Sequence, residues 1–311
     1  MNTQGAQVGL VGFPHDEGVK RNGGRVGAAA GPEAFRRFLP KIGTLVNREF
    51  GIDLQPLKVF DFGDVKAGLS LEEGHKELTK RVLSVLRSGA VPFVVGGGND
   101  QSFANCSALL DHLQESSASS MAVVNIDAHL DVRPLKEGGL AHSGSPFRQI
   151  LSDPRFIALN GKFVEFASQG HQCSAEHWDL VNDRANATII PLSALRGYSL
   201  GGLSHQQKHA RGVEDGFSDL LDGTIGESVF VSFDVDSIQG SDCPGVSAPA
   251  TIGLTAQEAL NICFLAGHSP RVKMVDLSEY NPSVEDYRTG RLLVLMFYYF
   301  LLGYSQRHTV S

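Results

Sequence analysis

Residues 123–134 read VVNIDAHLDVRP, and this stretch decides both the fold and the chemistry expected of the chain. Its first four residues are apolar or neutral, which is typical of a buried strand. Asp127, His129 and Asp131 then occupy alternate positions, and Arg133 follows. Ligands bind beyond the carboxyl ends of the strands in a parallel sheet, so these side chains are candidates for a binding or catalytic site.

Short apolar runs rich in β-branched residues recur along the whole chain and predict further strands. Several are apolar almost throughout instead of alternating with polar residues, which is typical of strands that helices cover on both faces. The predicted strands lie at residues 8–13, 57–63, 91–97, 121–129, 187–192, 228–236 and 272–280.

Helical periodicity and helix start signals fill the stretches between these strands. Ser70 opens one helical run that stops near Gly89, and Thr255 opens another. Glu258 follows Thr255 by three residues, as in a capping box. The apolar run 292–303 is shorter than the roughly 18 residues of a membrane span, so a buried helix is expected there.

The alternation of strands and helices predicts a three-layer α/β/α sandwich around a mostly parallel sheet. Residues 1–311 are expected to form a single catalytic domain. Residues 160–222 are harder to assign, and the segment 197–212, GYSLGGLSHQQKHARG, is expected to be a surface insertion or a partner-contact loop.

Composition excludes several classes of partner. The formal net charge is −7, and no cluster of lysine or arginine stands out, so no nucleic-acid partner is expected. No secretory signal or membrane span is apparent, which predicts a cytoplasmic protein. The chain has four scattered cysteines without a CxxC pair, which fits a reducing compartment; they are Cys106, Cys173, Cys243 and Cys263. Cys243 is expected to be an inert loop cysteine.

Polar side chains follow four of the predicted strands at their carboxyl ends. An isolated aspartate there is more often a turn or helix cap than a metal ligand, and a lone histidine is often a core residue. Several carboxylates at one sheet edge, however, repel one another unless a cation neutralises them. Carboxylates with an imidazole suit Mn²⁺, so the joint pattern predicts a manganese site. The residues at these strand ends are Asn99, Asp100, Asp127, His129, Asp131, Asp234, Asp236 and Glu279.

Seven motifs, in this order, resemble the ureohydrolases, a binuclear manganese family that includes arginase, agmatinase and formimidoylglutamase. They are GRVGAAAGP, GGGND, NIDAHLDVRP, HSGSPFRQI, SFDVDS, PGVSAPA and DLSEYNP. The resemblance covers nearly the whole chain. It implies an arginase-like fold, two Mn²⁺ ions per chain and a homo-oligomer, either a trimer or a hexamer.

The motifs DVRP, HSGSPFRQ and PGVSAPA are most similar to the formimidoylglutamase branch. That branch hydrolyses N-formimino-L-glutamate to L-glutamate and formamide, a reaction of histidine degradation. The resemblance implies that a hydroxide bridging the two metal ions is the nucleophile. It also implies a small amino-acid substrate.

The resemblance assigns a role to each matching residue. One metal ion would take Asn99, Asp127, Asp131 and Asp234 as ligands, and the second would take Asp127, His129, Asp234 and Asp236. Asp127, which would bridge both ions, thereby counts among the catalytic residues. Glu279 matches the carboxylate that holds the cationic amidine-like nitrogen of the substrate, and so is both a catalytic and a substrate-binding residue.

Arg133 supports the formimidoylglutamase branch on physical grounds. Arginases usually have asparagine at this position, which in the family faces the α-carboxylate of the substrate. An arginine fork pairs a carboxylate bidentately, whereas agmatine has no carboxylate to offer. The alternative is an internal salt bridge from Arg133 to Asp131 or Glu137.

Two departures from the family pattern affect the site. Asn99 stands where the family usually has histidine, so the metal site near Asn99 is expected to be weaker and added Mn²⁺ to raise the activity. Ser143 takes the position of the proton-shuttle histidine of arginase, and His142 comes one residue earlier. Either is a candidate catalytic residue, or either could instead cap the helix that starts near Ser145.

Two other functions remain open at this point. The first is another ureohydrolase specificity, such as arginase, agmatinase or guanidinobutyrase. The second is a catalytically inactive ureohydrolase-like subunit, which only Asn99 supports, because the other five ligands and Glu279 are retained.

Overall fold

A single eight-stranded sheet runs through the computed structural model, which describes residues 5, 7–41, 43–116, 118–197, 212–223 and 225–307. The strand order is β4-β1-β5-β10-β9-β6-β7-β8, and all neighbours are parallel. These strands are β1 (Val8–Phe13), β4 (Val59–Asp64), β5 (Val91–Gly96), β6 (Met121–Ile126), β7 (Lys162–Ser168), β8 (Ala187–Pro191), β9 (Ser228–Asp234) and β10 (Val272–Ser278). A separate antiparallel hairpin pairs β2 (Val46–Asn47) with β3 (Ile52–Asp53).

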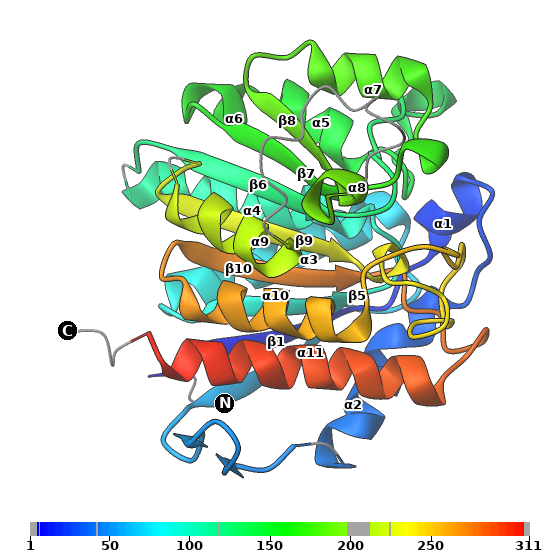
Figure 1. Cartoon of the computed structure of the whole chain (residues 1–311). Coiled ribbons are helices and arrows are strands. Elements are labelled where there is room, and N and C mark those ends of the chain that lie inside the picture. The colour runs from blue at the N-terminus through cyan, green and yellow to red at the C-terminus, as the bar shows by residue number, and fades with distance from the viewer. Residues whose placement is uncertain are drawn as a thin grey trace.

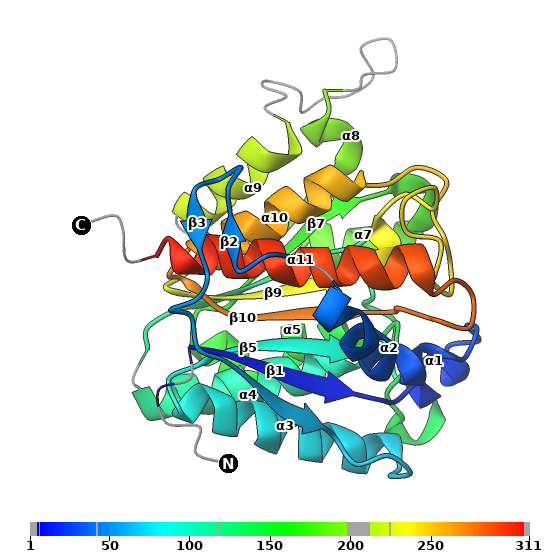
Figure 2. The ribbon, with the colours of Figure 1, turned by 90° about the horizontal axis from the view of Figure 1, so that it is seen from below.

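Helices cover both faces of the eight-stranded sheet and complete three layers (Figures 1 and 2). One apolar core lies under α2 (Gly31–Phe38), α8 (Leu192–Leu195), α9 (Val213–Asp222), α10 (Ala256–His268) and α11 (Tyr287–Ser305). The other lies under α3 (Leu71–Arg87), α4 (Gln101–Ser116), α5 (Pro146–Ser152), α6 (Pro154–Ala158) and α7 (Ala175–Asn182). The short helix α1 (Glu17–Arg21) follows β1. The predicted α/β/α sandwich with a parallel sheet is therefore confirmed.

The inner strands of the sheet are buried on both faces because successive side chains contribute to opposite cores. In β1, Val8 and Leu10 belong to the core under α11, whereas Val11 and Phe13 belong to the core under α3. All six residues of β1 are buried, as are all six of β5 and of β6. This double coverage explains why these strands read as continuous apolar runs.

The helix signals in the sequence are confirmed as well. Ser70 and Thr255 both cap their helices, and each forms a capping box with the glutamate three residues on. The apolar run 292–303 lies within the largely buried helix α11. In the part of the chain that the structure describes, no helix has the length and apolar character needed to cross a membrane.

Strand β7 is the element of the main sheet that the sequence did not predict. Its sequence, KFVEFAS, places Glu165 in the middle of a mainly apolar run. This charged residue obscures the pattern of a strand in which every residue but Lys162 is buried. Most of the segment expected to be a surface insertion, residues 198–211, lies outside the described residues.

The sheet topology brings the candidate ligands together. Strands β5, β10, β9 and β6 are consecutive neighbours in the sheet, and all four run in the same direction. Their carboxyl ends therefore form one continuous edge, although the strands are scattered over nearly 200 residues of sequence. Of the predicted metal ligands, Asp234 ends β9, and the others lie in the segments that directly follow β5, β6 and β9. Glu279 directly follows β10.

Gly97, in the loop after β5, holds two chain segments close to this edge. Its nitrogen donates to Phe13 O (2.9 Å), and its carbonyl accepts from Glu279 N (2.7 Å). A Cβ atom at Gly97 would lie 1.8 Å from the backbone oxygen of His15. No side chain can therefore be accommodated without moving the backbone.

We expect Gly97→Ala to lower the free energy of unfolding by roughly 2 kcal/mol, because a close-packed backbone cannot relax around the added methyl group. Urea unfolding measures this change. Gly170→Ala is the control, since a Cβ at Gly170 meets no atom within 4 Å. Equal stability of the two variants would show that the loop after β5 is looser than the structure indicates.

Candidate metal centre and active site

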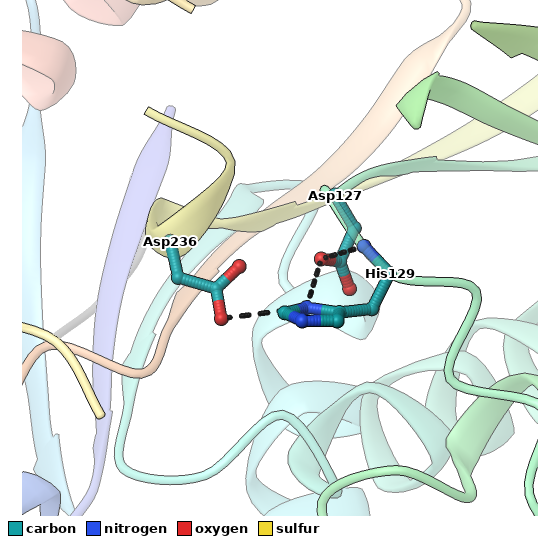
Figure 3. Close-up of side chains that lie close together, drawn as sticks. All are labelled: Asp127, His129 and Asp236. Carbon is teal, nitrogen blue, oxygen red and sulfur yellow. Dashed lines mark hydrogen bonds and ion pairs between the residues drawn. The ribbon is translucent and has the colours of Figure 1, made fainter. Parts of the chain in front are cut away.

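Carboxylates and one imidazole from two strand ends form the centre of the site. Two groups of three residues place their ligand atoms within 4.8 Å of one another, and Asp127 belongs to both. The groups are Asp127, His129 and Asp236, and Asp127, Asp131 and Asp234. Figure 3 shows the first group, in which the His129 ring lies between two carboxylates. Its Nδ1 is 3.3 Å from Asp127 Oδ1 and 3.6 Å from Asp236 Oδ2.

The spacing of the motifs follows from a turn that each strand-end aspartate makes. Asp127 Oδ1 accepts from the backbone nitrogen of His129 (2.8 Å), and Asp234 Oδ1 accepts from that of Asp236 (3.0 Å). Such a bond bends the chain so that the side chain two residues on returns toward the aspartate. The DAH and DVD motifs therefore place pairs of ligands on one side of the strand end.

Two site residues have backbone angles that non-glycine residues rarely adopt. Asp131 has φ of 45° and Glu279 has φ of 68°. Neighbouring segments hold both, because Asp131 O accepts from Phe147 N (3.2 Å) and Glu279 N donates to Gly97 O (2.7 Å). Strain of this kind is concentrated at functional sites, where the surrounding structure maintains it. Aspartate enters this region more often than glutamate does, so the backbone angle of Glu279 is the less expected of the two.

The carboxylates of the centre are short of positive charge. Burial, with the neighbouring Asp236, raises the pKa of Asp127 to about 6. Burial, with the neighbouring Asp127, raises the pKa of Asp131 to about 7. Burial and neighbouring carboxylates also hold the pKa values of Asp234 and Glu279 well above the ordinary range. A divalent cation among these groups would favour their charged forms.

His129 and Asp236 indicate how a cation would fit. Burial lowers the pKa of His129, but the carboxylates of Asp236 and Asp127 outweigh it and raise the pKa to about 12. A protonated imidazole thus provides positive charge in the metal-free site. Asp236 Oδ1 is buried and has no hydrogen-bond partner. An orphaned carboxylate oxygen beside oxygen and nitrogen donors suits Mn²⁺.

Asn99 is fully buried, and hydrogen bonds fix its carboxamide. Nδ2 donates to Asp131 Oδ2 (2.8 Å), while Oδ1 accepts from the hydroxyl groups of Ser102 and Ser278, both at 3.0 Å. Its backbone nitrogen donates to Glu279 Oε1 (3.0 Å). Asn99 therefore joins the second ligand group, through Asp131, to Glu279. The amide nitrogen is the end of its side chain that faces Asp131.

A cavity of about 200 Å³ opens onto the centre. It is lined by Val19, Asn22, Gly23, Gly24, His129, Asp131, Arg133, Ser143, Asp234, Asp236, Ser247, Ala248 and Glu279. Arg133 is exposed, and its Nη1 donates to Asn22 Oδ1 (3.0 Å). In the described part of the chain, Arg133 pairs with this carboxamide and not with Asp131 or Glu137, the partners of the internal salt bridge considered above.

Ser143 and His142 have different positions relative to the cavity. Ser143 lines it, whereas the His142 ring is turned into the loop and does not. His142 Nδ1 accepts from Gly144 N (3.2 Å), so Nε2 carries the proton and donates to Pro134 O (2.9 Å). Burial lowers the pKa of His142, which keeps the ring neutral. Both ring nitrogens of His142 thus pair with backbone groups of the loop, and of the two candidates Ser143 is the one that lines the cavity.

Cys243 does not reach the cavity surface either. It is fully buried in the core under α11, and burial raises the pKa of its thiol far above the ordinary value. A buried thiol in apolar surroundings is unreactive, as expected of this residue from the sequence.

Several cavity residues were not identified as functional from the sequence. Asn22, Gly23 and Gly24 come from the loop after α1, and Ser247 and Ala248 from the loop after β9. They lie beside or within the motifs GRVGAAAGP and PGVSAPA, which matched the family pattern but contain no metal ligand. A glycine pair after asparagine signals a turn and not a chemical role.

The fold and the site together define a metalloenzyme of the arginase type. The chain matches the Arginase family over residues 6–303 and therefore belongs to that family. It is a hydrolase of this family, with candidate ligands at the carboxyl ends of β6 and β9.

Formimidoylglutamases are among its most similar relatives. The chain is 30% identical to the formimidoylglutamase of Aromatoleum aromaticum, and the match covers 91% of this chain and 79% of that relative. It is 33% identical to the formimidoylglutamase of Aeromonas salmonicida, and the match covers 92% of this chain and 83% of that relative. The crystal structure of Trypanosoma cruzi formiminoglutamase with Mn²⁺ is 46% identical, with a TM-score of 0.88, and the match covers 97% of this chain and 94% of that one.

Mn²⁺ is expected to stabilise the protein more strongly as the pH rises from 5 to 8. The raised pKa values of about 6 for Asp127 and about 7 for Asp131 mean that the folded, metal-free protein binds more protons than the unfolded chain. As the pH rises, these two carboxyl groups lose their protons and the metal-free folded protein becomes less stable. Mn²⁺ binds more tightly at the same time, because fewer protons compete for its ligands. Thermal melting with and without Mn²⁺ measures the effect, and a gain in Tm that is largest at pH 5 would contradict it.

Proposed function

We propose that this protein is a formimidoylglutamase that uses Mn²⁺ to hydrolyse N-formimino-L-glutamate to L-glutamate and formamide. One observation carries the proposal: the exposed arginine Arg133 lines the same small cavity as the acidic metal centre and Glu279. The similarity to formimidoylglutamases over about nine-tenths of the chain supports it. A guanidinium beside a carboxylate-lined centre suits a substrate with an amidine at one end and a carboxylate nearby.

The two groups of ligand atoms are the proposed metal sites. Asp127 would bridge them, with Asp131 and Asp234 completing one site and His129 and Asp236 the other, to which Asp234 would contribute a second oxygen. When bound, the two Mn²⁺ ions supply a water molecule of lowered pKa as the nucleophile. His129 must lose its proton to serve as a ligand, because only the neutral imidazole has a free lone pair.

The residues around the centre would orient the substrate. Glu279 already accepts from Asn99 N with one oxygen (3.0 Å), and its second oxygen would accept from the amidine nitrogen. Arg133 would pair the α-carboxylate. The hydroxyl of Ser143 accepts from Asn22 Nδ2 (3.1 Å), which leaves its own proton for the leaving nitrogen. These contacts would hold the formimino carbon over the centre.

Asn99 is the proposed fourth ligand of the site that contains Asp131. A half-turn of a carboxamide exchanges Oδ1 and Nδ2, and both Ser102 and Ser278 can accept as well as donate a hydrogen bond. Either orientation of the amide therefore keeps its buried end paired. With Oδ1 toward Asp131, Asn99 offers a neutral oxygen, which is a weaker donor than imidazole.

The resemblance also implies a cellular setting and an assembly. We place the protein in the cytoplasm, in line with its four free cysteines, three of which are buried. We further infer a homo-oligomer, a trimer or a hexamer, in line with exposed apolar side chains such as Leu45 and Phe50, which are 63% and 47% exposed. Residues 1–311 would form one catalytic domain, because one sheet takes strands from Val8 to Ser278.

The proposed function predicts that chelator-stripped protein releases L-glutamate from N-formimino-L-glutamate only after Mn²⁺ is added. L-arginine, agmatine and 4-guanidinobutyrate are the controls, with urea as the product to be detected. Release of urea from any of the three would replace the proposed substrate with another ureohydrolase specificity. No turnover of any substrate by protein with bound Mn²⁺ would instead favour the inactive subunit.

Asn99→His is expected to increase the metal retained through dialysis from below two ions per chain toward two, because imidazole donates more strongly than an amide. Metal analysis of the dialysed proteins measures this directly, without reference to activity. The control is Asn186→His, because Asn186 is only half-buried and can accept a larger side chain. Asn105 is fully buried and would not serve. Wild-type protein that already retains both ions would contradict the expected weakness of the site.

A further inference from the structure

The loop after α1 brings a carboxamide between the two groups proposed to contact the leaving half of the substrate. Asn22 caps α1, and its backbone nitrogen donates to Gly18 O (3.1 Å). Its side-chain Oδ1 accepts from Arg133 Nη1 (3.0 Å), and its Nδ2 donates to the hydroxyl of Ser143 (3.1 Å). One amide thus joins two side chains that lie ten residues apart in the sequence.

The surrounding loop fits closely around this carboxamide. Arg133 N donates to Gly144 O (2.8 Å), and Ser143 N donates to Gly18 O (3.1 Å), so the three segments are held together by backbone bonds as well. A Cβ at Gly144 would lie 3.0 Å from both Asn22 Nδ2 and Arg133 Cδ. Because Gly144 has no side chain, it leaves room for the Asn22 carboxamide.

The two contacts of the Asn22 side chain match a requirement of the proposed reaction, and the inference rests on that proposed function. In N-formimino-L-glutamate the leaving nitrogen and the α-carboxylate are attached to the same carbon atom. The group that protonates the nitrogen and the group that pairs the carboxylate must therefore lie side by side. Asn22 contacts one candidate for each role, and it lines the same cavity.

We propose that Asn22 is a positioning and specificity-determining residue, which orients Arg133 toward the α-carboxylate and Ser143 toward the leaving nitrogen of an α-amino-acid substrate. Arg133 is exposed, and an exposed arginine samples many rotamers unless a partner holds it. Oδ1 of Asn22 holds Nη1 and leaves the other guanidinium nitrogens for the substrate. Nδ2 occupies a lone pair of the Ser143 hydroxyl, so that its proton points elsewhere.

Asn22→Ala is expected to raise KM for N-formimino-L-glutamate about tenfold and to lower kcat severalfold, the size of effect that follows from losing one or two hydrogen bonds. KM would rise because Arg133 is no longer held toward the α-carboxylate, and kcat would fall because Ser143 is no longer oriented toward the leaving nitrogen. Asn22→Asp is nearly isosteric and places a negative charge beside Arg133. It should raise KM further than alanine does, because this charge competes for the guanidinium and repels the substrate.

A double-mutant cycle with Arg133→Ala separates positioning from a general structural role. If Asn22 acts on KM through Arg133, then Asn22→Ala adds no further increase in KM once Arg133 is absent. The matched control is Asn261→Ala, because Asn261 is also half-buried and has both ends of its amide paired, with Gln257 (2.8 Å) and Glu214 (3.0 Å), but lies on α10 away from the cavity. This control should leave KM and kcat unchanged.

The outcomes distinguish this inference from the proposed function. If wild-type protein turns over the substrate and both Asn22 variants match it, or if the effect on KM persists in full without Arg133, the inference is wrong and the proposed function stands. If wild-type protein has no turnover, calorimetric binding of L-glutamate to the Mn²⁺-loaded protein decides. Weaker binding by Asn22→Asp than by wild type then supports the inference, and equal or absent binding overturns it.

Discussion

The mutual repulsion of buried carboxylates is the constraint around which this structure is organised. The neighbouring parallel strands β9 and β6 bring five acidic or imidazole side chains to one edge of the sheet, and burial raises the pKa values of Asp127 and Asp131 to about 6 and about 7. A fold gains nothing from such a cluster by itself, since each buried carboxylate costs free energy unless a cation or a proton neutralises it. The double-sided cover of helices provides the compensating stability, and the metal provides the charge.

Much of the fold and part of the site were predictable because they follow from local rules. Parallel strands buried on both faces read as apolar runs, and capping boxes mark where α3 and α10 begin. The DAH and DVD motifs were recognisable because an aspartate at a strand end turns the chain and returns the side chain two residues on, as Asp127 and Asp234 do. Such signals depend only on neighbours in sequence.

The features that could not be predicted depend on contacts between distant segments. Strand β7 was missed because Glu165 interrupts its apolar pattern, and only its pairing with β6 and β8 explains the burial of that residue. The left-handed backbone of Glu279 depends on Gly97, far away in sequence. His142 and Ser143 were alternative candidates from the sequence, and only the fold shows that Pro134 and Gly144 pair both ring nitrogens of His142. Residue type indicates capability, whereas orientation requires the fold.

The surroundings of Asn99 show how a carboxamide could take the place of the family's histidine. Beneath it, Ser102 and Ser278 pair the amide, and Ser102 is in turn within hydrogen-bond distance of Ser232 (2.9 Å) and Asp276 (3.1 Å). Hydroxyl groups can reverse their donor and acceptor roles, so this buried network can adapt to whichever end of the carboxamide it meets. An imidazole has only two ring nitrogens to pair. On the proposed assignment, this reversible network would let the neutral amide turn its oxygen toward the metal site while its buried end stays paired.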